Sequence, residues 1–184
     1  MTQITVSKRL TVIRGAAIVF AGALLIAAFV RPSRPARESD EGYQTHVYVT
    51  WDRFEVDRCV AAWLIKRFVD PLAQFELLPV GSELPQDGRI AFDAPKARYE
   101  RTPGKPVSEA ILSDTQLVDP AVSRIVQLVR ATELAFWRLE ADSQEGRLRN
   151  AIQLLWNPQL EPNERFRRVF SYLDALRDNG GVVP

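Results

Sequence analysis

The sequence predicts an α+β domain, a small β-sheet in the first half packed by a helical second half, preceded by an N-terminal apolar membrane or signal helix. Three observations lead to this fold class. Short segments rich in β-branched and aromatic residues occur up to residue 100. Beyond residue 106, apolar residues recur at helical spacing. An uncharged apolar run fills Gly15–Val30. A sheet and helices that each bury one apolar face form a stable layered domain.

The first 31 residues predict a membrane or export segment. Three basic residues precede the uncharged run Gly15–Val30, which as a helix would span about 24 Å. That is slightly less than the roughly 30 Å hydrocarbon core, so the helix must extend toward Leu10 to cross it. Neither Ala28 nor Ala36 is preceded by a small residue at the −3 position. Residues 1–31 therefore predict an uncleaved signal anchor, with a cleaved signal peptide or a buried apolar helix as the alternatives.

Residues 32–44, rich in proline, serine and charge, predict a linker, and residues 45–180 predict the folded domain. A single N-terminal anchor favours a domain on the exported, periplasmic side of the membrane, or a secreted form if the segment is cleaved.

The charge of the chain is unevenly distributed. Residues 1–40 carry six basic and two acidic side chains (net +4), and residues 41–184 carry eighteen basic and twenty-one acidic ones (net −3). Because duplex-binding surfaces have a basic excess, no nucleic-acid partner is expected.

The first half of the domain predicts strands around one helix. Thr45–Trp51 alternates and is rich in β-branched and aromatic residues, which is typical of a strand. Val56–Pro71 has one apolar stripe at spacings of three and four and closes on an Asp-Pro pair, so it predicts a single amphipathic helix. Gln74–Val80 and Ile90–Asp93 predict further strands, and Ala97–Glu100 is a candidate fourth.

The second half predicts four helices. Val107–Leu112 forms the first, and Asp119 followed by proline starts the second as an N-cap. The third covers Ser143–Trp156. Asn163 is expected to cap the last helix, Phe166–Leu176, which ends at an Asn-Gly-Gly sequence.

The segment Val56–Pro71, VDRCVAAWLIKRFVDP, resembles the opening of the C-terminal domain of ChrB-type chromate resistance proteins. The resemblance covers approximately residues 46–137 and continues at Phe75, at Phe92-Asp93, at Glu109 and at Asp119-Pro120-Ala121. It implies an accessory protein associated with chromate or related oxyanion resistance, which binds or senses rather than catalyses. The family regulators carry a separate N-terminal domain where this chain has its apolar segment, which argues against a transcriptional role.

The chain departs from the family pattern at its His and Cys positions. Where relatives have an aromatic-x-His-x-Gly-x-x-Cys run, Arg101 stands for the His and Pro106 for the Cys. A His-Asp pair is replaced by Arg130-Ala131, and Ala61 stands at a further Cys position. The resemblance thus implies a divergent member. Two alternatives stay open: a metal- or thiol-dependent redox enzyme acting on chromate, and an envelope structural or interaction module without a ligand.

Chromate is a tetrahedral dianion, so its recognition needs guanidinium or ammonium groups or backbone N–H donors. The basic candidates are Arg53, Arg58, Arg98, Arg101 and Lys105, and the supporting carboxylates are Asp57, Asp93 and Glu109. The alternative is that these side chains are solvated surface charges or ion-pair partners of one another. The same three carboxylates could build a hard-metal site, but their spacing does not require one.

The remaining candidates for chemistry are few, because the chain has one cysteine and one histidine. Cys59 lies on the apolar stripe, where burial makes a thiol unreactive. His46 opens a strand and is expected to be structural or exposed. The four tryptophans are expected in the core: Trp51, Trp63, Trp137 and Trp156. No catalytic residue, metal or cofactor is predicted.

Overall fold

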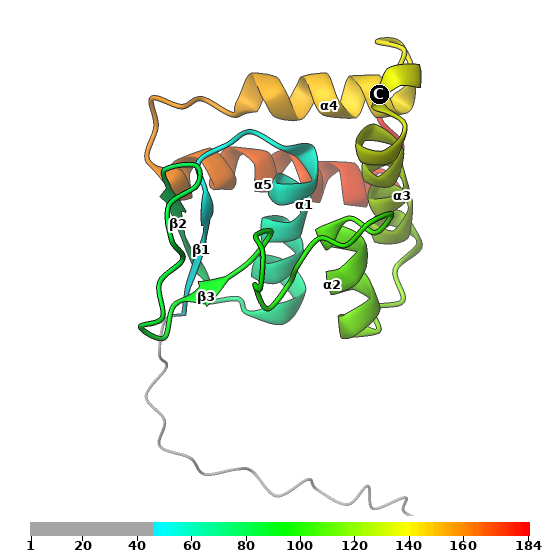
Figure 1. The fold of residues 1–184 in the computed structure, drawn as a ribbon. Coiled ribbons are helices and arrows are strands. Elements are labelled where there is room, and N and C mark those ends of the chain that lie inside the picture. Colours follow the sequence, from blue (N-terminus) through cyan, green and yellow to red (C-terminus); the bar gives the residue numbers. More distant parts are fainter. Residues whose placement is uncertain (1–45) are drawn as a thin grey trace, which may run out of the picture. The chain divides into compact units, whose positions relative to one another are not determined.

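The computed structural model describes residues 46–184. The predicted signal segment, residues 1–31, and the linker, residues 32–44, lie outside the described residues. The described part contains a three-stranded sheet and five α-helices, so the α+β prediction is confirmed (Figure 1). Among the described residues, no helix has both the length and the apolar character needed to cross a membrane.

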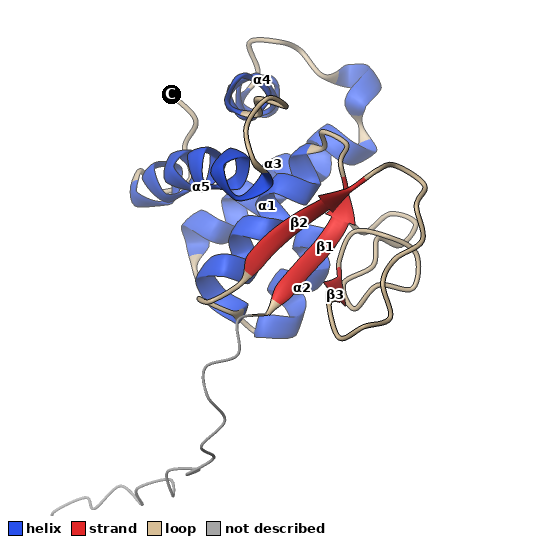
Figure 2. Ribbon diagram, turned by 90° about the vertical axis from the view of Figure 1, so that its left-hand side faces the viewer, coloured by secondary structure: helices blue, strands red, loops and turns tan. Residues whose placement is uncertain are grey.

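The sheet consists of β1 (Val47–Trp51), β2 (Gln74–Leu78) and β3 (Ile90–Ala91), in the order β2-β1-β3. Both neighbours run parallel to β1. The chain therefore leaves the central strand toward one side to form β2 and later returns on the other side to form β3. Figure 2 shows the sheet in front of the helices, with the loops after β2 and β3 gathered beside β3.

The helix after β1 is the centre of the domain. All nine residues of α1 (Val56–Leu64) are buried, and it contacts the four other α-helices. The sequence predicted one helix to Pro71, but the α-helix gives way to a π-helical turn, η1 (Ile65–Val69). Apart from the first residue of η1, its side chains lie closer to the surface than those of α1.

The other helices follow in chain order. They are α2 (Val107–Thr115), α3 (Pro120–Leu134), α4 (Gln144–Leu155) and α5 (Pro162–Asp178), with a short 3₁₀ turn, η2 (Phe136–Arg138), after α3. The predicted cap at Asp119 is confirmed, because its carboxylate accepts hydrogen bonds from the N–H groups of Ala121 and Val122. Ser143 also caps a helix, α4, where its hydroxyl accepts a hydrogen bond from the N–H group of Gly146.

Three local predictions are wrong. Asn163 does not cap α5, because that helix already begins at Pro162; its side-chain oxygen instead accepts the Phe75 N–H at 2.9 Å. Ala97–Glu100 is not a strand, and only an isolated bridge joins Tyr99 to Phe92. Trp137 is 66% exposed rather than buried, because it lies in η2 beyond the helices that enclose the core.

An aromatic cluster joins the sheet to α5. Phe75 of β2 packs on Phe166 at 4.8 Å between ring centroids and on Phe170 at 5.7 Å. Tyr48 of β1 and Phe92, just after β3, continue the cluster. Large aromatic side chains contribute much of the energy of a core. The packing therefore fixes Phe92, which directly precedes Asp93 of the candidate site.

Candidate functional site

A cavity of about 270 Å³ lies beyond the carboxyl ends of β1 and β3. Its lining residues are Trp51, Arg53, Glu55, Arg58, Asp93, Ala94, Pro95, Glu100 and Arg101; we call it the arginine–carboxylate cavity. Parallel sheets bind ligands outside the carboxyl ends of their strands, at the point where the strand order reverses. In the order β2-β1-β3, that point lies between β1 and β3, and the cavity is therefore in the place where this topology favours a ligand.

A buried ion pair forms the floor of the cavity. Arg58 in the first turn of α1 and Asp93 after β3 each have side chains only 3% exposed, and Arg58 Nη2 lies 2.8 Å from Asp93 Oδ2. Arg58 Nη1 also donates to the Arg53 carbonyl oxygen at 2.6 Å. Asp93 has a φ of 49°, in the left-handed region that non-glycine residues seldom adopt. Such strained residues concentrate at ligand sites.

Arg101 is surrounded by four carboxylates. Its Nη2 lies 2.8 Å from Glu55 Oε2, 3.4 Å from Asp57 Oδ2 and 3.5 Å from Asp93 Oδ1, and its Nη1 lies 3.0 Å from Glu133 Oε2. Burial disfavours the charged guanidinium, but these carboxylates outweigh that effect and raise the pKa of Arg101. Arg101 therefore stays positively charged and balances part of the surrounding negative charge.

Asp57 has a structural role that its position in the sequence did not reveal. Asp57 lies in the first turn of α1, where a negative charge is favourable to the dipole of its own helix. In the structure its fully buried carboxylate accepts the N–H groups of Val107 at 2.7 Å and Ser108 at 2.9 Å. These are the first residues of α2, whose own N-cap residue, Pro106, has no side-chain donor or acceptor. Asp57 thus caps α2 from α1.

Two carboxyl groups of the site hold protons more strongly than usual. Burial raises the pKa of Asp93 to about 7, assisted by the negative charges of Asp57 and Glu55, although Arg58 and Arg101 act in the opposite direction. The close ion pair with Arg58 favours the ionised form, and burial favours the neutral one. Burial outweighs the ion pair, because the Asp93 side chain is only 3% exposed. Burial also raises the pKa of Glu133.

The structure brings some predicted site residues together and separates others. Three of the five basic candidates line the cavity: Arg53, Arg58 and Arg101. Two of the three carboxylates, Asp57 and Asp93, lie within 3.5 Å of Arg101. Arg98 instead lies 5.3 Å from the centre of the Tyr99 ring, Lys105 lines a separate cavity, and Glu109 pairs with Arg130.

Three acidic residues of the site were missed. Glu55 and Glu133 both contact Arg101, and Glu100 lines the cavity. Glu55 immediately precedes the first helix, a position that could have marked it as a neighbour of Arg58. Glu133 lies near the end of α3, and no sequence pattern connects it to Arg101.

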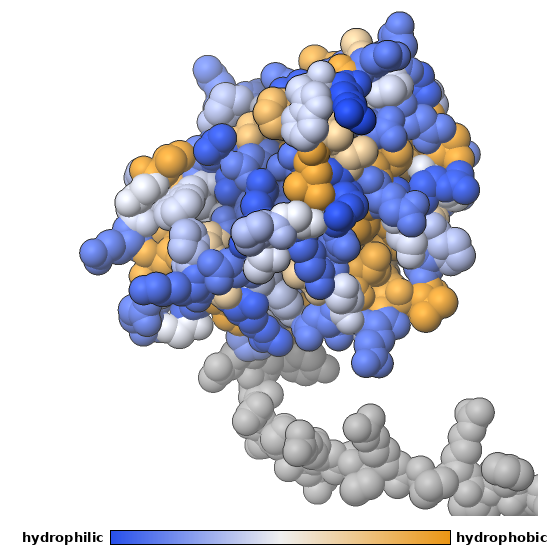
Figure 3. Space-filling view, turned by 45° about the vertical axis from the view of Figure 1, so that its right-hand side comes forward, coloured by the Kyte–Doolittle hydropathy of each residue, from blue (hydrophilic) through white to orange (hydrophobic). Residues whose placement is uncertain are grey.

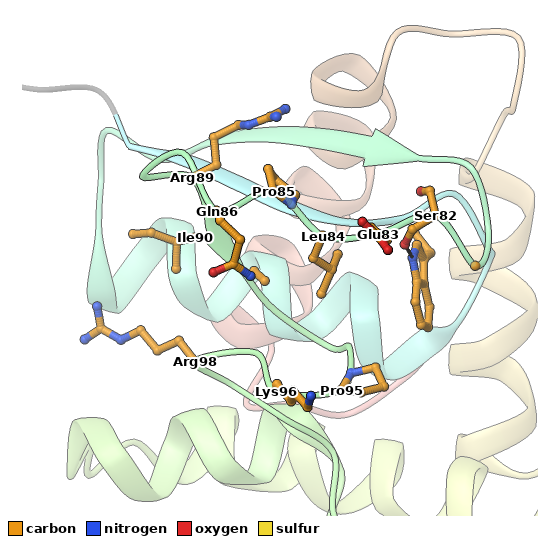
Figure 4. A pocket seen from close by; sticks show the side chains of 13 residues that line it. Ser82, Glu83, Leu84, Pro85, Gln86, Arg89, Ile90, Pro95, Lys96 and Arg98 are labelled. Carbon is orange, nitrogen blue, oxygen red and sulfur yellow. Dashed lines mark hydrogen bonds between the residues drawn. The ribbon is translucent and has the colours of Figure 1, made fainter.

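A larger cavity of about 700 Å³ lies beside the first and shares Trp51 and Pro95 with it. Figure 4 shows Arg89 and Arg98 toward the same side of this cavity, above and below Gln86, with Leu84 farther toward Glu83 and Ser82. Arg89 is held by Asp87 and Glu76. The cavity therefore offers Lys96 and Arg98 as basic groups at its surface, but no buried charged group.

The single thiol and the single imidazole lie outside the cavity. Cys59 is fully buried, and burial raises the pKa of its thiol. His46 is exposed and its Nδ1 lies 2.9 Å from Asp70 Oδ2. Within residues 46–184, no three His, Cys, Asp or Glu side chains are arranged to hold a metal ion. The hard-metal set of Asp57, Asp93 and Glu109 does not assemble, because Glu109 turns to Arg130.

Comparison with known proteins identifies the family. The family model described as ChrB, C-terminal domain, matches residues 48–179, which include the whole cavity. The chain belongs to the ChrB C-terminal domain family. Protein ChrB of Cupriavidus metallidurans is 30% identical over 151 residues, which cover 81% of this chain and 41% of that relative. The chain thus spans about two fifths of the length of this ChrB protein. No solved structure has significant similarity to it.

Replacing Asp57 by alanine should destabilise the domain by about 3 kcal/mol, because two buried N–H groups of α2 would lose a charged acceptor. The free energy of unfolding from urea titrations measures this. Asp119→Ala, which removes the local cap of α3, should cost about 1 kcal/mol. Equal losses in the two variants would show that Asp57 is not the more important cap.

Asp93→Asn should change how stability depends on pH. The native pKa of about 7 lies above the unfolded value, near 3.9. The stabilisation that Asp93 gives is thus complete below about pH 4 and is lost as pH rises through 7. The amide of the variant does not titrate. The stability of the variant relative to the native protein should therefore increase by up to about 1.4 kcal/mol per pH unit between pH 4 and 7. Urea unfolding at several pH values measures this, and parallel pH profiles would refute the raised pKa.

Cys59 should not react with a thiol reagent such as DTNB in the folded protein, because it is buried and its thiolate is disfavoured. In guanidinium chloride it should react completely. Since the chain has one cysteine, the released chromophore reports on this residue alone. Complete labelling of the native protein within seconds would instead support a thiol-dependent redox role.

Proposed function

We propose that this ChrB-type domain binds or senses chromate, or a related tetrahedral oxyanion, in the arginine–carboxylate cavity, as an accessory protein in oxyanion resistance. Membership of the ChrB family supports the link to chromate. The main structural support is that Arg53, Arg58 and Arg101 line one cavity at the carboxyl ends of the sheet. Guanidinium groups are the preferred donors to tetrahedral anions.

The three arginines differ in how easily they can reach a ligand. Arg58 is buried and held by Asp93, so it can supply a fixed positive charge. Arg53 is 68% exposed and pairs with Glu55 at 3.3 Å. Arg101 is partly exposed and shares Glu55 with it. An anion entering the cavity would therefore replace Glu55 as the partner of Arg53 and Arg101, while Arg58 keeps its position.

The proposed role is binding rather than catalysis. Cys59 is buried away from the cavity, and the chain carries no second cysteine. Cavity residues act on the anion through charge and hydrogen bonds. Attachment of the domain to the membrane, or its export, is part of the proposal and rests on the apolar sequence Gly15–Val30.

Arg101→Ala should weaken chromate binding by tenfold or more. The variant loses a charged donor, usually about 1.5–3 kcal/mol, and leaves Glu55, Asp57, Asp93 and Glu133 to repel an anion. Equilibrium dialysis of the full-length chain, with chromate followed by its own absorbance, measures the affinity.

Arg98→Ala is the matched control. It removes the same charge from the neighbouring cavity, so the affinity should stay within about twofold of the native protein. Absence of saturable binding by the native chain, or equal binding by the native chain and Arg101→Ala, would refute the proposed function. Loss of binding in Arg98→Ala alone would assign the anion to the larger cavity.

A further inference from the structure

A single carboxylate, that of Glu55, contacts all three arginines of the arginine–carboxylate cavity. Glu55 Oε2 lies 2.8 Å from Arg101 Nη2 and 3.4 Å from Arg58 Nη2. Glu55 Oε1 lies 3.3 Å from Arg53 Nε. Both oxygens are thus held by guanidinium groups, which is how arginines bind the oxygens of an anionic ligand. The Glu55 carboxylate therefore occupies the position that the proposed function assigns to an external anion.

The side chain of Glu55 does not hold its own helix. Glu55 is the N-cap residue of α1, but its side chain accepts no hydrogen bond from the first turn. The Asp119 carboxylate does so at the start of α3. The backbone carbonyl oxygen of Glu55 accepts the Cys59 N–H at 3.2 Å, and this bond does not depend on where the carboxylate lies. The carboxylate can therefore leave the arginines without the loss of a helix cap.

The contacts of Glu55 are easier to exchange than the ion pair between Arg58 and Asp93. The Glu55 side chain is 17% exposed, and water reaches its partners Arg53 and Arg101 more freely still. Arg58 and Asp93 are almost completely buried. Ion pairs that water can reach contribute little net free energy, because solvent screens them and the side chains lose conformational freedom in forming them. An entering anion can therefore replace Glu55 while Arg58 and Asp93 stay paired.

There is room for the displaced Glu55 side chain beside the arginine–carboxylate cavity. A separate cavity of about 340 Å³, next to the end of α3, is also lined by Glu55 and Arg53. Glu55 thus borders both cavities, and a rotation of its side chain can carry the carboxylate from one to the other. Arg149 of α4 also lines the second cavity, so a carboxylate that turns there still meets a positive charge.

The formal charge of the arginine–carboxylate cavity depends on where the Glu55 carboxylate lies. The lining contains three basic and three acidic residues: Arg53, Arg58, Arg101, Glu55, Asp93 and Glu100. With all six ionised the lining is neutral, and departure of the Glu55 carboxylate leaves one positive charge in excess. An anion is therefore attracted in place of the Glu55 carboxylate rather than in addition to it.

We propose that Glu55 is an internal competitor of the anion: its carboxylate holds the three arginines until an external oxyanion displaces it toward the neighbouring cavity. The inference rests on the proposed function. A carboxylate attached to the cavity wall has a high effective concentration. The apparent dissociation constant of the anion is the intrinsic one divided by the fraction of molecules in which Glu55 has moved away. Glu55 thus sets the concentration of oxyanion above which the site fills.

The test compares chromate binding by the native full-length chain and by Glu55→Gln, in equilibrium dialysis at one pH and one salt concentration. The glutamine side chain has nearly the same shape but no charge, so it holds the arginines more weakly. Glu55→Gln should bind chromate about tenfold more tightly or better, because a charge-assisted contact contributes at least about that factor and no carboxylate has to be displaced.

Two further variants separate the contact of Glu55 from its charge. Glu55→Asp keeps the charge but shortens the side chain by one methylene, so it cannot contact all three guanidinium groups from the same backbone position. Chromate should then bind about threefold more tightly. Glu100→Gln removes one negative charge from the same lining, at a residue that forms no ion pair with another described residue, and should tighten binding by at most about twofold.

Urea unfolding shows whether each variant is folded. Aspartate is a preferred N-cap residue, so Glu55→Asp should fold and decides the question if Glu55→Gln does not.

The outcomes separate the two proposals. Chromate binding by the native chain that is equal or weaker in both Glu55 variants would overturn the internal competitor and leave the proposed function standing. Equal gains in Glu55→Gln and Glu100→Gln, with none in Glu55→Asp, would overturn it as well, since charge alone explains them. Tight binding by Glu55→Gln with none by the native chain would support the competitor and overturn the proposed function. Absence of binding by every form would overturn both.

Discussion

The ion pair between Arg58 and Asp93 joins two distant parts of the chain, the first turn of the central helix α1 and the segment that follows β3. Its position determines where the loop following β3 begins. That loop carries Arg101 back over the start of α1 and then leads into α2. The ion pairs of Arg101 and the cap on α2 both depend on this loop returning to α1.

Burying the charges of Arg58 and Asp93 costs desolvation free energy. The desolvation cost of two charges commonly equals or exceeds their attraction, so a buried ion pair is weak evidence for stability. Here the guanidinium gains a further bond to the Arg53 carbonyl oxygen, while Arg58 Nε and Asp93 Oδ2 stay without hydrogen bonds. An apolar pair would fill the space without those two orphans. The arrangement is more easily understood as one adapted to a ligand than as one adapted to stability.

The surface gives less indication of function than the cavity does. Figure 3 shows apolar side chains in separate groups among hydrophilic ones on the face that it presents. Phe136, Trp137 and Leu154 are among the exposed large apolar residues of the described part. Nothing in the structure shows what would cover them. The charged residues of the cavity therefore carry the functional argument.

Local chemistry explains which parts of this structure the sequence could predict. Asp119 and Ser143 cap helices through bonds to residues two or three positions away, so their roles are visible in the sequence. Asn163 bonds across to β2 instead. The parallel pairing of the strands and the π-helical turn also depend on packing between distant segments.

The same difference between local chemistry and contacts of distant segments applies to the residues of the site. The anion chemistry of chromate pointed to Arg58 and Arg101, and the two residues do meet in one cavity. The carboxylates of Glu55 and Glu133, which determine the charge balance around Arg101, come from segments far apart in the chain. No spacing rule connects them. The basic donors of the site are therefore recognisable from residue chemistry, whereas the carboxylates around them are brought there by the fold.

The cap that Asp57 places on α2 also bears on how the chain folds. The two partners are separated by 50 residues. The first N–H groups of α2 can acquire this acceptor only after the intervening chain has closed into a loop, which costs conformational entropy before the bond is gained. A short helix without a local cap is marginal on its own. We therefore expect α2 to become ordered late, after the sheet and α1 have assembled. The part of the domain next to Arg101 that α2 forms would then be among the last to fold.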